Sequence, residues 1–289
     1  MASSKALLWV AALLLFLLLM LVTPRIPQDQ DYHDFADHRA MLGIPNALNV
    51  VSNFPFLVIG AVGMVLTLQG RSFRLSLEGE VLGWTWFFLG VAATAFGSSY
   101  YHLHPDDSRL VWDRLPMTIS FTAIMAVFVI ERVDDRTGKA SVFPLLAAGA
   151  LSVAYWRFAD DLRPYALVQF VPCIAIPVMT LTMPPQYTHS LYWLWAAGCY
   201  LLAKVAEASD NQIYRWTGHL VSGHTLKHLL AALVPVFIMI MLARREEAVD
   251  KVCIMTKLRN HSRVRRLCGK EEGSEQDDTE ANLLTNSVP

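Results

Sequence analysis

The chain has 289 residues, of which 54% are hydrophobic and only 17% are charged. A soluble domain carries about 25% charged residues, so the composition argues against a soluble globular protein and favours a bilayer environment. A net charge of −1, from 24 basic and 25 acidic residues, gives no indication of nucleic-acid binding. The four cysteines include no C-x-x-C pair, so neither a disulfide framework nor a zinc finger is indicated.

An uninterrupted apolar run covers residues 6–22, directly after Lys5. A cleaved signal peptide is one interpretation, but the run is longer than the roughly 7–15 apolar residues of a signal peptide, and no small-residue cleavage site follows it. Its length approaches the lower limit for spanning a bilayer. We therefore predict that residues 1–23 form a retained transmembrane helix or signal anchor.

Seven further apolar segments follow a polar, acidic segment at residues 24–45. They cover residues 46–68, 80–102, 112–131, 141–157, 164–183, 189–206 and 221–243. Apolar runs of about this length are typical of membrane-spanning helices, and their internal prolines are tolerated because neighbouring helices satisfy the freed carbonyl groups. The sequence therefore predicts an all-α integral membrane protein with a seven-helix core over residues 46–243, preceded by one additional N-terminal hydrophobic helix.

Residues 244–289 form a tail that is first basic and then acidic and rich in Ser, Thr and Asn. It has too little apolar content to fold alone, so we expect it to be disordered. Its basic part either binds anionic lipid headgroups or is merely solvated. The excess of Lys and Arg places the tail in the cytosol and residues 24–45 on the opposite side. We expect a multi-pass protein of the endoplasmic reticulum or Golgi.

Polar side chains gather at the ends of three apolar segments that this topology places near one non-cytosolic face: Ser98, His102, Asp113, His224 and His228. Residues four apart share one face of a helix, as Ser98 and His102 do. The short loop before Asp113 makes the second and third segments antiparallel neighbours, which brings Asp113 close to His102. Three neutral imidazoles suit zinc, and three protein ligands leave a position open for catalysis.

Zinc lowers the pKa of a bound water and polarises a carbonyl group. Asp113 is then expected to orient the water or accept its proton, and Ser98 to hold the water or donate to the developing oxyanion. Zincins carry Glu directly after the first His of their motif, whereas this chain has Thr225 there. The alternative is that each histidine has only a structural role and hydrogen-bonds to a neighbouring helix. Ionisable groups inside a bilayer are costly and tend to be functional, and here several lie at the same depth in the membrane.

Four motifs are quite specific in combination: Ser98-x3-His102-x10-Asp113, Asp113-Arg-Leu-Pro-Met117, Asn49-Val-Val-Ser-Asn53 and His224-x3-His228. With them the chain resembles the alkaline ceramidases, and most closely the alkaline phytoceramidase branch, over roughly Asp31 to Arg245. These enzymes belong to a superfamily of seven-helix membrane hydrolases that also includes the adiponectin and progestin receptors.

The resemblance implies that the three histidines hold zinc and that Ser98 and Asp113 lie beside the metal-bound water. It implies hydrolysis of the amide bond of ceramide or phytoceramide within the membrane, giving a sphingoid base and a fatty acid. The expected partners are the bilayer and its lipid substrate. Two alternatives stay open: a seven-helix lipid receptor or sensor that keeps the zinc site with little or no turnover, and a transporter that uses His and Asp as a proton relay.

Alkaline ceramidases that have a calcium site bind the ion through an acidic segment before the first core helix. The ligands implied in this chain are Asp31, Tyr32, Asp34, Ala36 and Asn46, with Asp37 as a further candidate. Oxygen ligands of this kind suit calcium. Asn46 stands where the family has an acid, which lowers the negative charge of the expected site.

Overall fold

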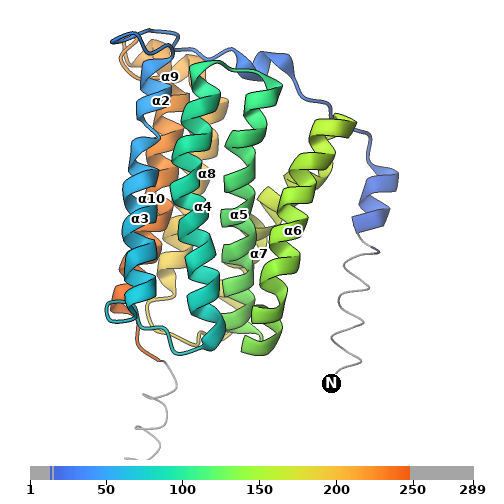
Figure 1. The fold of residues 1–289 in the computed structure, drawn as a ribbon, viewed down its shortest axis with the longest axis vertical. Helices are drawn as coiled ribbons and strands as arrows, with labels where there is room; N and C mark the ends of the chain where they lie inside the picture. Colours follow the sequence, from blue (N-terminus) through green and yellow to red (C-terminus); the bar gives the residue numbers. More distant parts are fainter. Residues whose placement is uncertain (1–13, 15, 248–289) are drawn as a thin grey trace, which may run out of the picture. The chain divides into compact units, whose positions relative to one another are not determined.

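The structure is a computed structural model that describes Leu14 and residues 16–247, and within these residues it is helical without a β-strand (Figure 1). It divides into two units. The first comprises Met1–Pro185 and His189–Arg245 and contains all the helices named below. The second comprises Gln186–Thr188 and Glu246–Pro289, and in its described part the Thr188 N–H donates to the Glu246 carbonyl at 2.8 Å.

The elements of the first unit are η1 (Gln30–His33), α2 (Ala47–Val51), α3 (Phe54–Gln69), α4 (Glu78–Leu103), α5 (Asp107–Arg132), α6 (Asp135–Ala159), α7 (Arg163–Thr182), α8 (Leu191–Ala208), α9 (Asp210–Trp216) and α10 (Gly223–Arg244). Within the described residues, six stretches are long and apolar enough to cross a membrane: α2 together with α3, α4, α5, α6, α7 and α10. The predicted all-α architecture is therefore confirmed.

Helices cover all seven predicted segments. The first segment contains two helices, α2 and α3, and the other six contain one helix each, of which α5 and α6 begin five or six residues earlier than predicted. The side chain of Asp106 accepts from the Arg109 N–H and starts α5, and Asp134 accepts from the Thr137 N–H and starts α6. The charged first turns that follow these caps are helical although they are not apolar. Apolarity alone therefore placed both starts too late.

Helices α4 and α5 are antiparallel neighbours, as the short loop between them predicted (Figure 1). Three glycines of α4, each seven residues from the next, face α5: Gly83, Gly90 and Gly97. A Cβ atom at Gly97 would lie 1.9 Å from the carbonyl oxygen of Trp112. Small residues let helix backbones approach closely in membrane proteins, and this contact brings the end of α4 against the start of α5.

The end of α4 and the starts of α5 and α10 lie at the same end of the helical unit (Figure 1). The acidic segment runs across this end and is fastened to it: the Leu162 N–H donates to the Ile26 carbonyl at 2.8 Å, and the Ala36 N–H donates to Asp210 at 2.9 Å. Most of residues 1–23 and nearly all of the tail lie outside the described residues, so the predictions for them stay predictions.

Candidate metal centre

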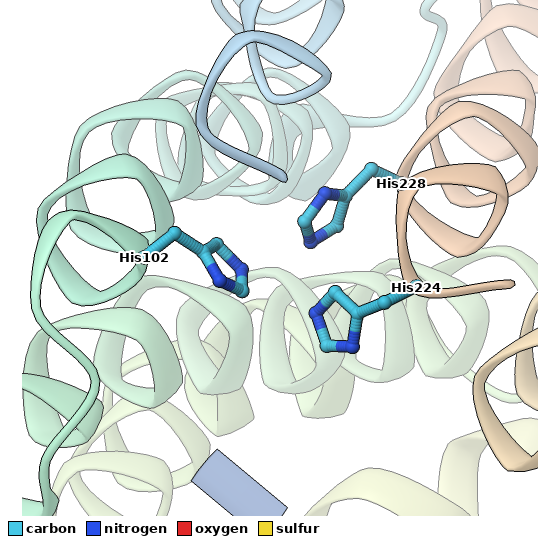
Figure 2. A group of neighbouring side chains, drawn as sticks. All are labelled: His102, His224 and His228. Carbon is cyan, nitrogen blue, oxygen red and sulfur yellow. The ribbon is translucent and has the colours of Figure 1, made fainter. Parts of the chain in front are cut away.

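Three histidines from two helices converge in the interior of the first unit (Figure 2). His102 projects from the last turn of α4, and His224 and His228 project from the start of α10. One ring nitrogen from each lies within 4.8 Å of the others. The side chains are buried, with exposed fractions of 0%, 4% and 3%. The structure thus brings together the three residues that the sequence predicted as metal ligands.

The ring nitrogens of this cluster suit a metal ion. The Nε2 atom of each histidine is buried and has no hydrogen-bond partner among the described residues, and the same holds for Nδ1 of His102. A buried polar atom without a partner costs about 1–3 kcal/mol. Several such nitrogens within one small volume are therefore best explained by a shared cation. Imidazole suits zinc, copper, iron and nickel, and the cluster by itself does not identify the metal.

A hydrogen-bond chain fixes the orientation of the His228 ring. Its Nδ1 atom lies 2.7 Å from the hydroxyl of Ser52, and that hydroxyl donates to the Asn49 carbonyl at 3.2 Å. In the tautomer that keeps the hydroxyl hydrogen on Asn49, Nδ1 carries the ring proton and donates to Ser52. The Nε2 atom is then left with a lone pair that faces the cluster. Metal-ligating histidines are commonly oriented in this way.

We expect Ser52→Ala to weaken metal binding by roughly 10-fold to 100-fold, because loss of such an orienting partner usually costs this much. The matched control is Ser99→Ala, which removes a hydroxyl that hydrogen-bonds only to the Val50 carbonyl and not to a histidine. Metal affinity of both variants is measured by competition with a chelating dye. Equal affinities of the two variants would contradict the role assigned to Ser52.

Asp113 and Ser98 are the carboxylate and the hydroxyl that the sequence predicts for the same site. Both are buried, with exposed fractions of 5% and 2%. Both line a cavity of about 690 Å³ together with His228. The cavity thus joins one candidate metal ligand to a carboxylate and a hydroxyl.

Phe35 and Asp210 also shape the centre, and the sequence analysis did not single them out for this role. The Phe35 ring is 3% exposed and covers the cluster, with ring centroids 4.8 Å from His102 and 4.5 Å from His224. Asp210 accepts from the His224 N–H at 2.7 Å and from the Ala36 N–H at 2.9 Å. It therefore joins the acidic segment to the start of α10.

The residues implied for calcium have several other partners. Tyr32 donates to Glu207 at 3.3 Å, Asn46 donates to the His102 carbonyl at 2.9 Å, and Asp34 lies 3.0 Å from His38. Asp37 is buried and, although burial alone would raise its pKa, hydrogen bonds from Arg39 lower it. In the described part of the chain, the three histidines are the one cluster of His, Cys, Asp or Glu with metal-ligand spacing. The calcium site stays a prediction.

If calcium does bind the acidic segment, added calcium should raise the melting temperature, because a ligand that binds only the native state stabilises it. The variant with Asp31→Ala and Asp34→Ala should lose this response. The measurement is a thermal-unfolding series in calcium and, as the ionic control, in magnesium. A melting temperature of the unaltered protein that does not change with calcium would mean that the segment is a solvated loop.

No protein-family model matches the chain, and no curated protein matches it in sequence. The fold and the site therefore define a class and no more: a helical protein, compatible with multiple membrane crossings, that has a buried three-histidine cluster able to bind a metal ion. The resemblance to the alkaline ceramidases stays a prediction.

Proposed function

We propose that this protein hydrolyses the amide bond of ceramide or phytoceramide within the membrane, releasing a sphingoid base and a fatty acid, and that its metal is zinc. One juxtaposition supports the proposal. His228, Asp113 and Ser98 line the same cavity, and most of the remaining wall is apolar. A metal ligand, a proton acceptor and a hydroxyl at one end of a lipid-sized cavity are the groups that amide hydrolysis requires.

The apolar part of the cavity suits a hydrocarbon chain. Its lining includes Phe56, Phe87, Val91, Phe121, Ile124, Ile176, Trp193 and Val234. The volume of about 690 Å³ lies within the roughly 300–1,000 Å³ of small-molecule sites. A lipid amide can therefore lie with its chains among these side chains and its polar end beside Asp113.

The chain's own residues carry the proton transfers. When bound, zinc acts as a Lewis acid that lowers the pKa of water and polarises a carbonyl group. The Asp113 carboxylate accepts a proton from the attacking water and passes it to the amide nitrogen as the C–N bond breaks. Ser98 donates its single hydroxyl hydrogen to the oxygen on which negative charge develops. Phe35 keeps bulk water from the histidines.

The finer membrane arrangement belongs to the same proposal. Adding α8 to the six long apolar stretches gives the seven-helix core, and residues 1–23 give an additional N-terminal helix. The residues after Arg244 then lie in the cytosol, in agreement with the excess of Lys and Arg, and the metal centre lies near the opposite face. We place the protein in the endoplasmic reticulum or Golgi.

The test is mass spectrometry of the products formed when purified protein is incubated with a panel of ceramides, phytoceramides and other lipid amides. We expect the unaltered protein to release equal amounts of sphingoid base and fatty acid. The Asp113→Asn variant should release much less of both products than the unaltered protein. If metal-loaded protein releases neither product from any member of the panel, the hydrolase proposal fails. If a lipid nevertheless binds in the cavity of this inactive protein, the result would favour the alternative of a seven-helix lipid receptor.

A further inference from the structure

Two lysines share one carboxylate at the polar end of the cavity. Glu207, near the end of α8, accepts hydrogen bonds from Lys204 and from Lys227, the second at 3.1 Å. The side chains of Lys227 and Glu207 are only 14% and 15% exposed, and all three residues line the cavity. One carboxylate neutralises one ammonium group, so one positive charge of this cluster has no counter-charge.

Arg114 adds a second positive charge to the same cavity. It is 5% exposed, and its Nη2 donates to the neutral amide oxygen of Gln28 at 2.7 Å. Its Nη1 is buried and has no hydrogen-bond partner among the described residues. The guanidinium lies over the rings of Trp156 and Tyr165, at 4.1 and 4.8 Å from their centroids. Ring faces stabilise a cation without neutralising it, so the Nη1 donors stay available.

Tyr32 connects the two cationic groups. Its hydroxyl donates to Glu207 at 3.3 Å, and its ring centroid lies 5.7 Å from the Arg114 guanidinium. Asp113 lines the same cavity as Lys227 and Arg114, and it directly precedes Arg114 in α5. The lysine cluster and the arginine therefore face one polar region, next to Ser98.

The charges of this region do not balance. Lys204, Lys227 and Arg114 outnumber Glu207 and Asp113, and a divalent cation at the histidines would widen the excess. Two further acids of the lining, Asp29 and Asp31, are exposed at the mouth, where solvent ions screen them. A buried positive charge without a partner is costly, which favours an anion as the missing partner.

We propose that Lys227 and Arg114 form an anion subsite that holds the acidic group of a lipid beside Asp113 and Ser98. The subsite rests on the proposed amide hydrolysis and deepens it: besides neutral ceramide and phytoceramide, the substrate class includes lipid amides with an anionic group at the polar end. The same chemistry would also hold the carboxylate of the fatty acid that the reaction releases. Ammonium and guanidinium groups form short, charge-assisted hydrogen bonds to phosphate and carboxylate.

The test is a binding competition, so its result does not depend on turnover. Full-length unaltered protein, which keeps the negative charge of Asp113, is loaded with a fluorescent lipid, and displacement by ceramide, by ceramide 1-phosphate of the same chains, or by the free fatty acid is read before product accumulates. We expect at least one of the two acidic lipids to bind roughly 10-fold to 100-fold more tightly than neutral ceramide, the usual contribution of a hydrogen bond to a charged group. The preference should weaken with added salt.

Lys227→Met should abolish the preference, and Lys227→Arg should keep it. The first variant leaves Glu207 paired with Lys204, so a stable fold is expected, and melting temperature without lipid verifies it. Lys139→Met is the control for loss of a lysine charge, because Lys139 forms an exposed ion pair with Glu78 at 2.9 Å outside the cavity lining. It should leave the preference unchanged.

Each outcome of the competition either identifies the anion that the subsite binds or shows that the subsite does not exist. Tighter binding of ceramide 1-phosphate identifies a headgroup, and tighter binding of the fatty acid alone identifies the product carboxylate. If neither acidic lipid binds more tightly than ceramide, or if Lys227→Met keeps the preference, the subsite is refuted. Absence of hydrolysis by the unaltered protein would refute the proposed function and leave this binding result intact.

Discussion

Replacing Asp113 with asparagine should lower the turnover of a lipid amide by roughly 10²–10⁴, the usual contribution of a positioned acid or base, and leave the metal in place. Asparagine keeps the shape of the side chain but cannot accept a proton. The metal should stay because Asp113 is not one of the three clustered ligands. Turnover and metal content are measured on the same preparations.

Ser98→Ala is the graded comparison for Asp113→Asn. It should reduce turnover less, because the hydroxyl assists a developing charge that the metal already stabilises. Both variants should have the metal content of the unaltered protein. Full activity of Asp113→Asn would remove the assigned base and move the interpretation to a lipid receptor that retains its metal.

Replacing His224 or His228 with alanine should remove the metal, which we expect at about one zinc per chain in the unaltered protein. Each substitution leaves only two of the three imidazoles, which is too few to hold the metal. Metal content is measured by elemental analysis after dialysis against a weak chelator. The same analysis identifies the metal, which the donor set alone does not identify.

His104→Ala is the matched control for these two variants. His104 is two residues from His102, its side chain is 71% exposed, and its ring lies 3.3 Å from Asp106, outside the cluster. Its loss should leave metal content unchanged. If His224→Ala and His228→Ala also keep their metal, or if the unaltered protein binds none, the metal centre does not exist. The transporter with a proton relay would then be the better interpretation.

The predictable part of this protein follows from local patterns. Runs of apolar residues predicted helices at all seven core positions because a helix in lipid must be apolar over most of its length. The spacing of His224 and His228, four residues apart, placed both rings on one face of α10. A short loop made α4 and α5 antiparallel, which placed Asp113 near His102. The positions of these four residues follow from helical periodicity and loop length, so the sequence could predict them.

Contacts between residues distant in sequence could not be predicted in this way. Phe35 covers the histidines because the polar segment folds back over the end of the helical unit, where Asp210 holds it through the Ala36 N–H. Ser52 orients His228, which is 176 positions away. Its motif, Asn49 to Asn53, was visible in the sequence, but its role was not.

The cationic end of the cavity shows the same limit. Lys204 and Glu207 are three residues apart, which places them on one face of α8, and the structure contains this ion pair. It adds Lys227 from α10, which local spacing does not connect with α8. Apolar length and helical period act within one segment, so the sequence by itself determined the helices and the three imidazoles. Which polar groups share the interior depends on how the helices and the polar segment pack, and only the tertiary structure decided that.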